Sequence, residues 1–114
     1  MASQSSRREV ELTPEAVGAL REIWEWNAEG HTPSHADAYL QFLATGIESL
    51  AVPDAAGRPV PGRPEVWYRL IRRRPGGHGH IVVYRVANNR VTLLRIFHTA
   101  QDWQAALSKE TPPS

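Results

Sequence analysis

The chain has 114 residues, of which 41% are hydrophobic and 22% are charged, and this composition predicts one globular domain with a core of ordinary size. It contains no cysteine, which excludes disulfides, thiolate metal sites and a cysteine nucleophile. No apolar run approaches the roughly 20 residues that span a bilayer, and the N-terminal residues lack the apolar core of a secretory signal, so we expect a cytoplasmic protein without membrane contact.

The formal net charge of +1 conceals an uneven distribution along the chain. Residues 1–57 carry three arginines against nine acids, a net charge of −6, whereas residues 58–98 carry nine arginines against Glu65 alone, a net charge of +8. This pattern predicts a polarised surface that attracts nucleic acid or an acidic protein segment. A run of solvated arginines without a partner is the alternative.

The first half of the chain predicts a short strand followed by a helix. Residues 1–8 are small, polar and basic, which predicts a disordered tail. After a short strand at residues 10–12, Thr13 is placed to cap a helix that has Pro14 at its first position and Glu15 near its positive end. A mostly apolar stripe then follows the helical repeat, with Trp24 expected in the core.

A second helix follows after a short connection, so the two helices are expected to form an antiparallel hairpin. Residues 34–37 resemble a capping box, with Asp37 in place of the usual glutamate. His31 and His35 lie four residues apart at this turn, but no third ligand is placed to complete a metal site, and we expect neither a metal nor a cofactor.

After a proline-rich loop at residues 52–65, the stretch from Val66 to His98 contains three apolar runs rich in β-branched and aromatic residues. Turn signals at residues 75–77 and 88–89 separate the runs, which predicts a meander of three antiparallel strands. Side chains alternate between the two faces of a strand. The face expected to meet the core carries Tyr68, Leu70, Val82, Tyr84, Val86, Leu94 and Ile96. The opposite face carries Trp67, Arg69, Ile71, Ile81, Val83, Arg85, Leu93, Arg95 and Phe97.

This second face is more apolar than a solvated surface, so we expect it to meet a partner. The alternative is that a terminal helix covers it, and a capping-box-like start at residues 99–102 does predict a short final helix. The predicted architecture is α+β, in the order β-α-α-β-β-β-α, with the helical hairpin on a small antiparallel sheet. The domain is expected to cover residues 9–108, between tails at residues 1–8 and 109–114.

Several segments together resemble the RelE/ParE superfamily of bacterial type II toxins, and within it the ParE-like, plasmid-stabilisation branch. The segments are Leu12-Thr-Pro-Glu-Ala16, Ala38-Tyr-Leu40, Ile47-Glu-Ser-Leu50-Ala51, Pro53-x-x-x-Gly57-Arg58, Trp67-Tyr-Arg69-Leu70, Ile81-Val-Val-Tyr84-Arg-Val86 and Leu94-Arg95-Ile-Phe-His98-x-x-x-Asp102. The resemblance implies a toxin that a cognate antitoxin neutralises, within a heterotetramer or a higher assembly. The target it implies is DNA gyrase for ParE-like proteins, or the ribosome and its mRNA for the endoribonuclease relatives.

The resemblance also implies candidate residues for RNA cleavage, which needs a base, an acid and cations around the scissile phosphate. The endonuclease relatives carry basic residues on the middle strand, where this chain has Ile81, and this difference favours gyrase inhibition over mRNA cleavage. If the chain cleaves RNA, the candidate catalytic residues are His98, Arg95, Arg69 and Arg85. Strict alternation points His98 toward the core, where a bond to a backbone group is the alternative role for its ring.

Two binding surfaces complete the predictions. Arg72, Arg73 and Arg74 precede a glycine-rich turn whose backbone amides are able to hold a phosphate, so we expect these arginines and His98 to contact the target. Base stacking is not predicted there, because few aromatic residues lie near the turn in the sequence. The predicted antitoxin-binding residues are Ile81, Val83, Arg85, Leu93 and Arg95.

Overall fold

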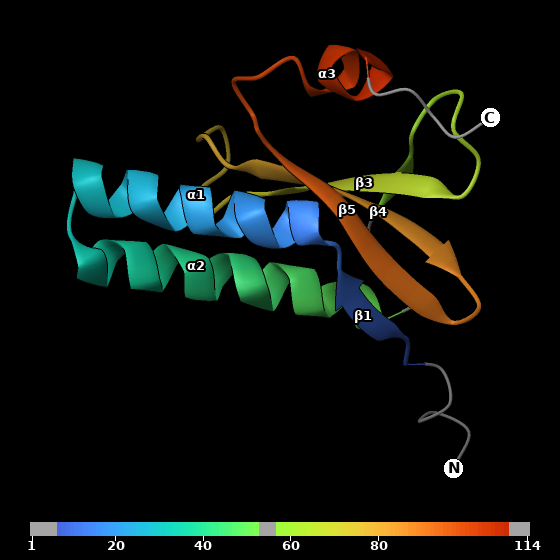
Figure 1. Ribbon diagram of the computed structural model, residues 1–114, viewed down its shortest axis with the longest axis horizontal. Coiled ribbons are helices and arrows are strands. Elements are labelled where there is room, and N and C mark those ends of the chain that lie inside the picture. Colours follow the sequence, from blue (N-terminus) through green and yellow to red (C-terminus); the bar gives the residue numbers. More distant parts are fainter. Residues whose placement is uncertain (1–6, 53–56, 110–114) are drawn as a thin grey trace.

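The computed structural model describes residues 7–52 and 57–109, and it has the predicted α+β architecture (Figure 1). A 3₁₀ turn after the second helix and a two-residue edge strand were not predicted. The elements are β1 (Glu9–Leu12), α1 (Pro14–Gly30), α2 (Pro33–Glu48), η2 (Ser49–Ala51), β2 (Arg58–Pro59), β3 (Val66–Ile71), β4 (His80–Ala87), β5 (Arg90–His98) and α3 (Trp103–Lys109). The predicted tails fall mostly outside the described residues.

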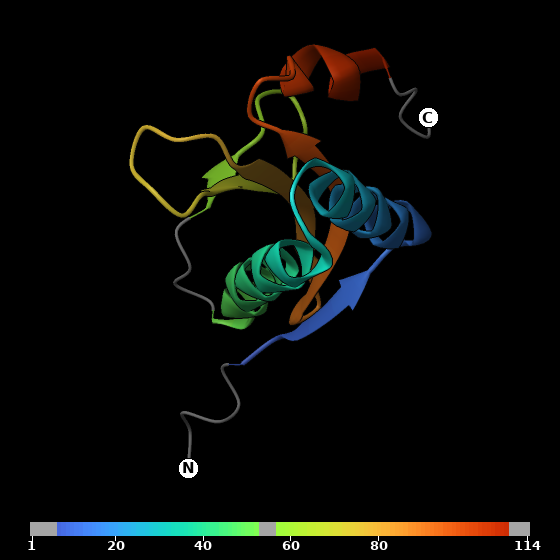
Figure 2. The same cartoon turned by 90° about the vertical axis from the view of Figure 1, so that its left-hand side faces the viewer.

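The helices α1 and α2 lie side by side as the predicted antiparallel hairpin (Figures 1 and 2). Thr13 caps α1 as predicted, because its hydroxyl accepts a hydrogen bond from the N–H of Ala16. The predicted start of α2 was two residues late, since Thr32 is the cap and Pro33 takes the first helical position. Trp24 is only half-buried, and its indole N–H binds Asp37 across the hairpin at 2.8 Å.

The sheet has the strand order β1-β5-β4-β3-β2 and is mixed, because β1 runs parallel to β5 while the other neighbours are antiparallel. The predicted meander is present. Asn88 and Asn89 both have positive φ, 53° and 59°, as a two-residue turn between twisted strands requires. The long helical hairpin between β1 and the meander allows the parallel pairing, which the local sequence does not reveal.

Each face of the sheet supports its own apolar cluster. The helical hairpin covers a cluster whose buried members are Ala16, Leu43, Ile47, Leu50, Ile71, Val82, Tyr84, Val91 and Leu93. On the opposite face, α3 covers a smaller cluster of Val60, Val66, Ile81, Val83, Phe97, Trp103 and Leu107. The second face is therefore covered by the terminal helix, which was the alternative to a partner.

Two errors in the predicted faces have physical causes. In β3 the assignment is inverted, because Ile71 lies in the cluster under the hairpin while Tyr68 packs against the other one. In β5 one extra residue, Leu94, is inserted opposite Val83 and Tyr84 of β4, so Leu93 faces the hairpin and Leu94 faces α3. Strict alternation fails across such a bulge.

Candidate functional site

A cleft of about 1000 Å³ opens between the helical hairpin and the turn that joins β3 to β4. One wall is the face of α1 that carries Glu22 and Trp26, and the other is the turn that carries Arg73, Arg74 and His78. The floor is formed by Tyr39 of α2 and by the paired strand ends, where His80 of β4 lies directly opposite His98 of β5.

Gly79 allows this crowded arrangement of strand ends. A Cβ atom at this position would collide with the carbonyl oxygen of Ile71 and with Arg72. The backbone N–H of Gly79 donates to the hydroxyl of Thr99, and its carbonyl accepts from the N–H of Thr99. These contacts fix the position from which His78 and His80 project.

His80 is buried at the floor of the cleft, with 8% of its surface exposed. Its Nδ1 is 2.7 Å from the hydroxyl of Tyr39. Burial, and secondarily the neighbouring charge of His98, lowers the pKa of His80 from 6.5 to about 4. Burial also raises the pKa of Tyr39, against an opposing effect of Arg73, so at neutral pH the pair is an uncharged phenol bound to an uncharged imidazole.

His98 contacts both neighbouring imidazoles, with ring centroids 5.5 Å from His78 and 5.3 Å from His80. Its Nδ1 accepts a hydrogen bond from the N–H of Ala100 at 3.0 Å, which is the predicted alternative of a histidine bound to backbone. Because Nδ1 uses its lone pair in this bond, the proton of a neutral His98 ring is on Nε2. The ring therefore has a donor left over, and it lines the cleft.

Arg73 is held over the aromatic floor of the cleft. Its guanidinium carbon lies 5.5 Å from the ring centroid of Tyr39 and 5.4 Å from that of Phe42, within the range of cation–π attraction. Within residues 7–52 and 57–109, neither Arg73 nor Arg74 forms an ion pair with a carboxylate. Both side chains belong to exposed residues at the cleft, so their charge is available to an anion.

The histidines do not form a recognisable metal site. In the part of the chain that the structure describes, no group of three or more His, Cys, Asp or Glu side chains has an arrangement that could hold a metal ion. The hydrogen bond from Ala100 makes His98 a poor metal ligand. To bind a metal through Nε2, the ring proton would have to move to Nδ1, and the hydrogen bond from the N–H of Ala100 would break.

The structure brings together three of the four predicted target-binding residues. Arg73, Arg74 and His98 line the cleft, whereas Arg72 does not. Sequence reasoning missed Tyr39, His80 and the exposed Trp26. The place of Tyr39 beside the apolar stripe of α2 and the placement of His80 at a strand start were available signals, but only the packing of α2 on the sheet joins them.

The four candidate catalytic residues are dispersed. Arg69 donates to the hydroxyl of Ser49 on the hairpin side of the sheet. Arg85 is exposed and pairs across strands with Val66, a member of the cluster under α3. Arg95 binds the carbonyl of Leu94 and lies 3.8 Å from Glu15. Only His98 lies in the cleft.

The five predicted antitoxin-binding residues do not share one surface. Ile81 and Val83 are buried under α3, with 8% and 0% of their surfaces exposed. Leu93 is fully buried in the other cluster, under the hairpin, because of the bulge in β5. Of the five, Arg85 is exposed and Arg95 is half-buried.

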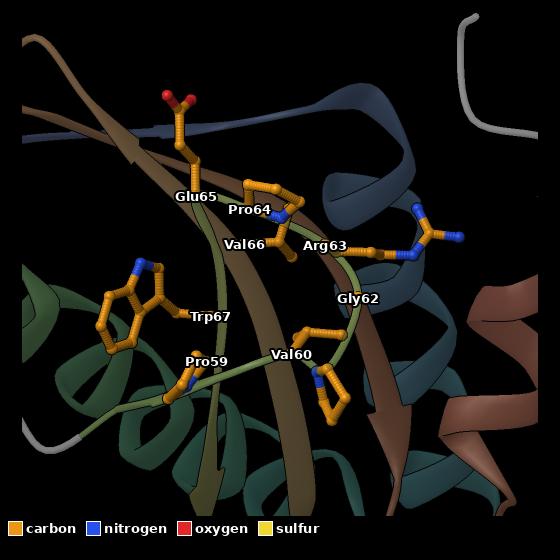
Figure 3. Close-up of a pocket in the computed structure, with 9 residues that line it drawn as sticks. Pro59, Val60, Gly62, Arg63, Pro64, Glu65, Val66 and Trp67 are labelled. Atoms are coloured by element: carbon orange, nitrogen blue, oxygen red, sulfur yellow. The ribbon is translucent and has the colours of Figure 1, made fainter.

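A second hollow, of about 460 Å³, lies at the loop between β2 and β3 (Figure 3). Its lining is mainly proline and valine. Arg63 and Trp67 extend to opposite sides of the loop, and the guanidinium of Arg63 donates to the carbonyl of Leu107 in α3. Because the guanidinium of Arg63 is bonded to α3, this hollow presents fewer polar groups to a ligand than the histidine-lined cleft does.

Comparisons with known proteins identify the family. A model of the ParE toxin of the type II toxin–antitoxin system, parDE, matches residues 10–103. The chain belongs to the ParE toxin family. Among solved structures, the toxin is similar to a chain of the chromosomal ParDE TA system from P. aeruginosa, with a TM-score of 0.67 and 19% identity. That match covers 81% of the toxin and 96% of the other chain, and at this identity it shows the shared fold. Comparison with curated protein sequences gives no match.

Proposed function

We propose that this ParE-family toxin arrests growth by inhibiting DNA gyrase, and that a cognate antitoxin neutralises it in the cytoplasm. The observation that carries the proposal is the family match over residues 10–103, since gyrase is the target implied by the ParE-like resemblance. In the described part of the chain, no helix has both the length and the apolar character needed to cross a membrane.

The test is expression of the toxin alone and together with the protein encoded by the adjacent reading frame. We expect the toxin alone to stop growth and to accumulate DNA breaks covalently linked to gyrase, and co-expression to restore growth. Unimpaired growth at confirmed expression of the folded toxin would contradict the toxin activity, and arrest without gyrase-linked breaks would contradict the target.

A second candidate function is ribosome-dependent cleavage of mRNA, and the cleft provides the observation that favours it. His80, His98 and Tyr39 are the residue types that transfer protons in such a reaction, and Arg73 could stabilise the charge of the phosphorane. Primer extension on translated mRNA distinguishes the two functions. New cuts in the A-site codon after induction would support mRNA cleavage and contradict gyrase inhibition as the function.

We also propose that the antitoxin contacts the α3 side of the sheet around Arg85, as part of a heterotetramer or a higher assembly. An acidic antitoxin segment would pair with this exposed arginine, which has a net basic sheet around it. Ile81 and Val83 would be reached only if α3 moved away, because Trp103 and Leu107 cover them. Size measurement of the purified complex tests the assembly.

A further inference from the structure

We propose that the cleft between α1 and the β3–β4 turn binds single-stranded DNA, with a phosphate against Arg73, Arg74 and His98 and a base against Trp26. The choice of DNA rather than RNA rests on the proposed action on gyrase. The binding itself would be a property of the toxin alone and would not require gyrase.

The phosphate is assigned to the turn side of the cleft. Arg73 and Arg74 carry positive charge there and form no ion pair within the described residues, and Arg73 is held in place by Tyr39 and Phe42. The Nε2–H of His98 adds a donor whose tautomer is fixed by the bond from Ala100. Arginine and imidazole donors that line the same cleft suit a phosphate group.

The base is assigned to the α1 side. Trp26 is the most exposed of the large hydrophobic side chains, with 69% of its surface accessible, and it lines the cleft. A flat aromatic surface beside a cationic one is the combination by which proteins bind unpaired nucleotides, since every base has a face that stacks. Glu22 on the same wall repels a phosphate, which places the phosphate on the opposite wall.

The strand is expected to be single, because the bases of a duplex are stacked on one another and present only their edges. A cleft of about 1000 Å³ bounded by α1 admits a few nucleotides of one strand. His80 contributes shape rather than charge, since its lowered pKa of about 4 leaves it neutral at the pH of the cell.

The test is fluorescence anisotropy of the full-length purified toxin with a labelled single-stranded DNA at low salt, without gyrase. We expect Arg73→Ala and Arg74→Ala each to weaken binding about fivefold or more, because each removes a charge that faces the phosphate. Trp26→Ala should also weaken binding about fivefold or more, whereas Trp26→Phe should retain most of the affinity, because phenylalanine keeps a surface on which a base stacks. Arg72→Ala is the matched control, since it removes the same charge from the same turn outside the cleft, and it should cost clearly less affinity than Arg73→Ala or Arg74→Ala.

His98 supplies a second pair of variants. His98→Asn retains an acceptor near the position of Nδ1 and removes the Nε2 donor, whereas His98→Gln places an amide near the position of Nε2. We expect binding to fall with asparagine and to be largely kept with glutamine, while circular dichroism shows both variants folded.

Five results would overturn the inference: absence of binding at low salt, an equal loss with Arg72→Ala, tighter binding of duplex DNA, cleavage of an RNA of the same sequence, or a mononucleotide that competes as well as the oligonucleotide. The last result would show that the cleft binds a small ligand rather than a DNA strand. Gyrase inhibition is measured in parallel. If the natural toxin inhibits gyrase but does not bind the single-stranded DNA, only this inference is refuted, whereas DNA binding without gyrase inhibition refutes only the proposed function.

Discussion

At the scale of single residues, His80 shows how a polar side chain is accommodated between the two halves of the fold. It is held by Tyr39 of α2 and lies against His98 of β5, with little contact to water. Its burial is tolerated because the imidazole stays neutral and hydrogen-bonded, and in the described residues no buried side-chain nitrogen or oxygen lacks a partner.

The lowered pKa of His80 predicts acid sensitivity of the fold. The unfolded chain takes up this proton near pH 6.5 and the folded protein only near pH 4, so the unfolded state binds more protons between these values. His80 therefore contributes up to about 3 kcal/mol to the free energy of unfolding above pH 6.5, and this contribution is lost as the pH falls toward 4. Urea denaturation across this range measures it.

His80→Asn is the matched variant for that measurement, because its side-chain oxygen can replace Nδ1 as the partner of Tyr39 without titrating. We expect its free energy of unfolding to vary less between pH 6.5 and 4 than that of the natural protein. An identical pH dependence in the two proteins would assign the effect to other ionisable groups.

At the scale of elements, the helical hairpin is fitted to the sheet along α2. Gly46 lies in the second half of α2 against β3, and a Cβ atom there would approach the Cδ1 atom of Ile71 to 2.8 Å. Ile71 is buried in the cluster under the hairpin, and its branched side chain has little room to move. Gly18 in α1 has no atom within 4 Å of such a position.

The two helix glycines therefore predict opposite results for the same substitution. Gly18→Ala should raise the free energy of unfolding by about 0.5–1 kcal/mol, because alanine favours the helix and meets no obstacle. Gly46→Ala should lower it by about 1–2 kcal/mol, because overpacking against Ile71 outweighs the helix preference. Thermal unfolding of both variants decides the matter, and stabilisation by Gly46→Ala would show that α2 can shift on the sheet.

The short helix α3 depends on tertiary packing. It has seven residues, too few for stability in isolation, and is anchored by Trp103 and Leu107. Leu107→Ala should lower the free energy of unfolding by about 2 kcal/mol, or detach α3 and expose apolar surface that binds a hydrophobic dye. Gln104→Ala, at an exposed position of the same helix, is the control, and equal effects of the two variants would contradict the packing of α3.

At the scale of the whole molecule, charge is segregated between an acidic hairpin and a basic sheet and turn. Surface ion pairs are formed by Arg90 with Glu9 and Glu11 and by Arg95 with Glu15. The carboxylate side chains in these pairs are more than half exposed. Exposed pairs of this kind contribute at most about 1 kcal/mol each to stability. The segregated charge is therefore expected to act on association with partners rather than on folding.

Salt separates these two effects. Added sodium chloride should change the free energy of unfolding by less than about 1 kcal/mol and should markedly slow association with an acidic antitoxin. Arg85→Ala should reduce that salt dependence, whereas Arg90→Ala should change it less, because nearby carboxylates already offset its charge. Titrations of each variant with antitoxin at two salt concentrations test this. If Arg85→Ala binds with the same salt dependence as the natural toxin, the antitoxin does not contact the surface around Arg85.

Val83→Asp, a substitution in the predicted antitoxin surface, tests the fold rather than the interface, because Val83 is buried. Val83 has no exposed surface and packs beneath α3, so Val83→Asp buries a charge inside the folded toxin. We expect it to unfold the protein or release α3, and loss of antitoxin binding by this variant alone does not locate the interface.

Local signals in the sequence were sufficient for most of the architecture. Thr13 and Pro14 marked the start of α1, the paired asparagines marked the turn between β4 and β5, and the alternating apolar runs marked the meander. Each of these depends on backbone preferences within a few residues, which is why a single sequence determines them. The segregation of charge was likewise fixed by the sequence, and the matched segments pointed to the toxin family.

Only the tertiary structure decided the faces of the strands and the composition of the cleft. The bulge in β5 moved Leu93 to the hairpin side, and the parallel pairing of β1 with β5 joined residues some 80 positions apart. The cleft likewise combines α1, α2 and the ends of β4 and β5, so Trp26 lies across the cleft from the arginine turn although about 50 residues separate them. Register and packing arise from contacts summed over the whole chain, and no local pattern records them.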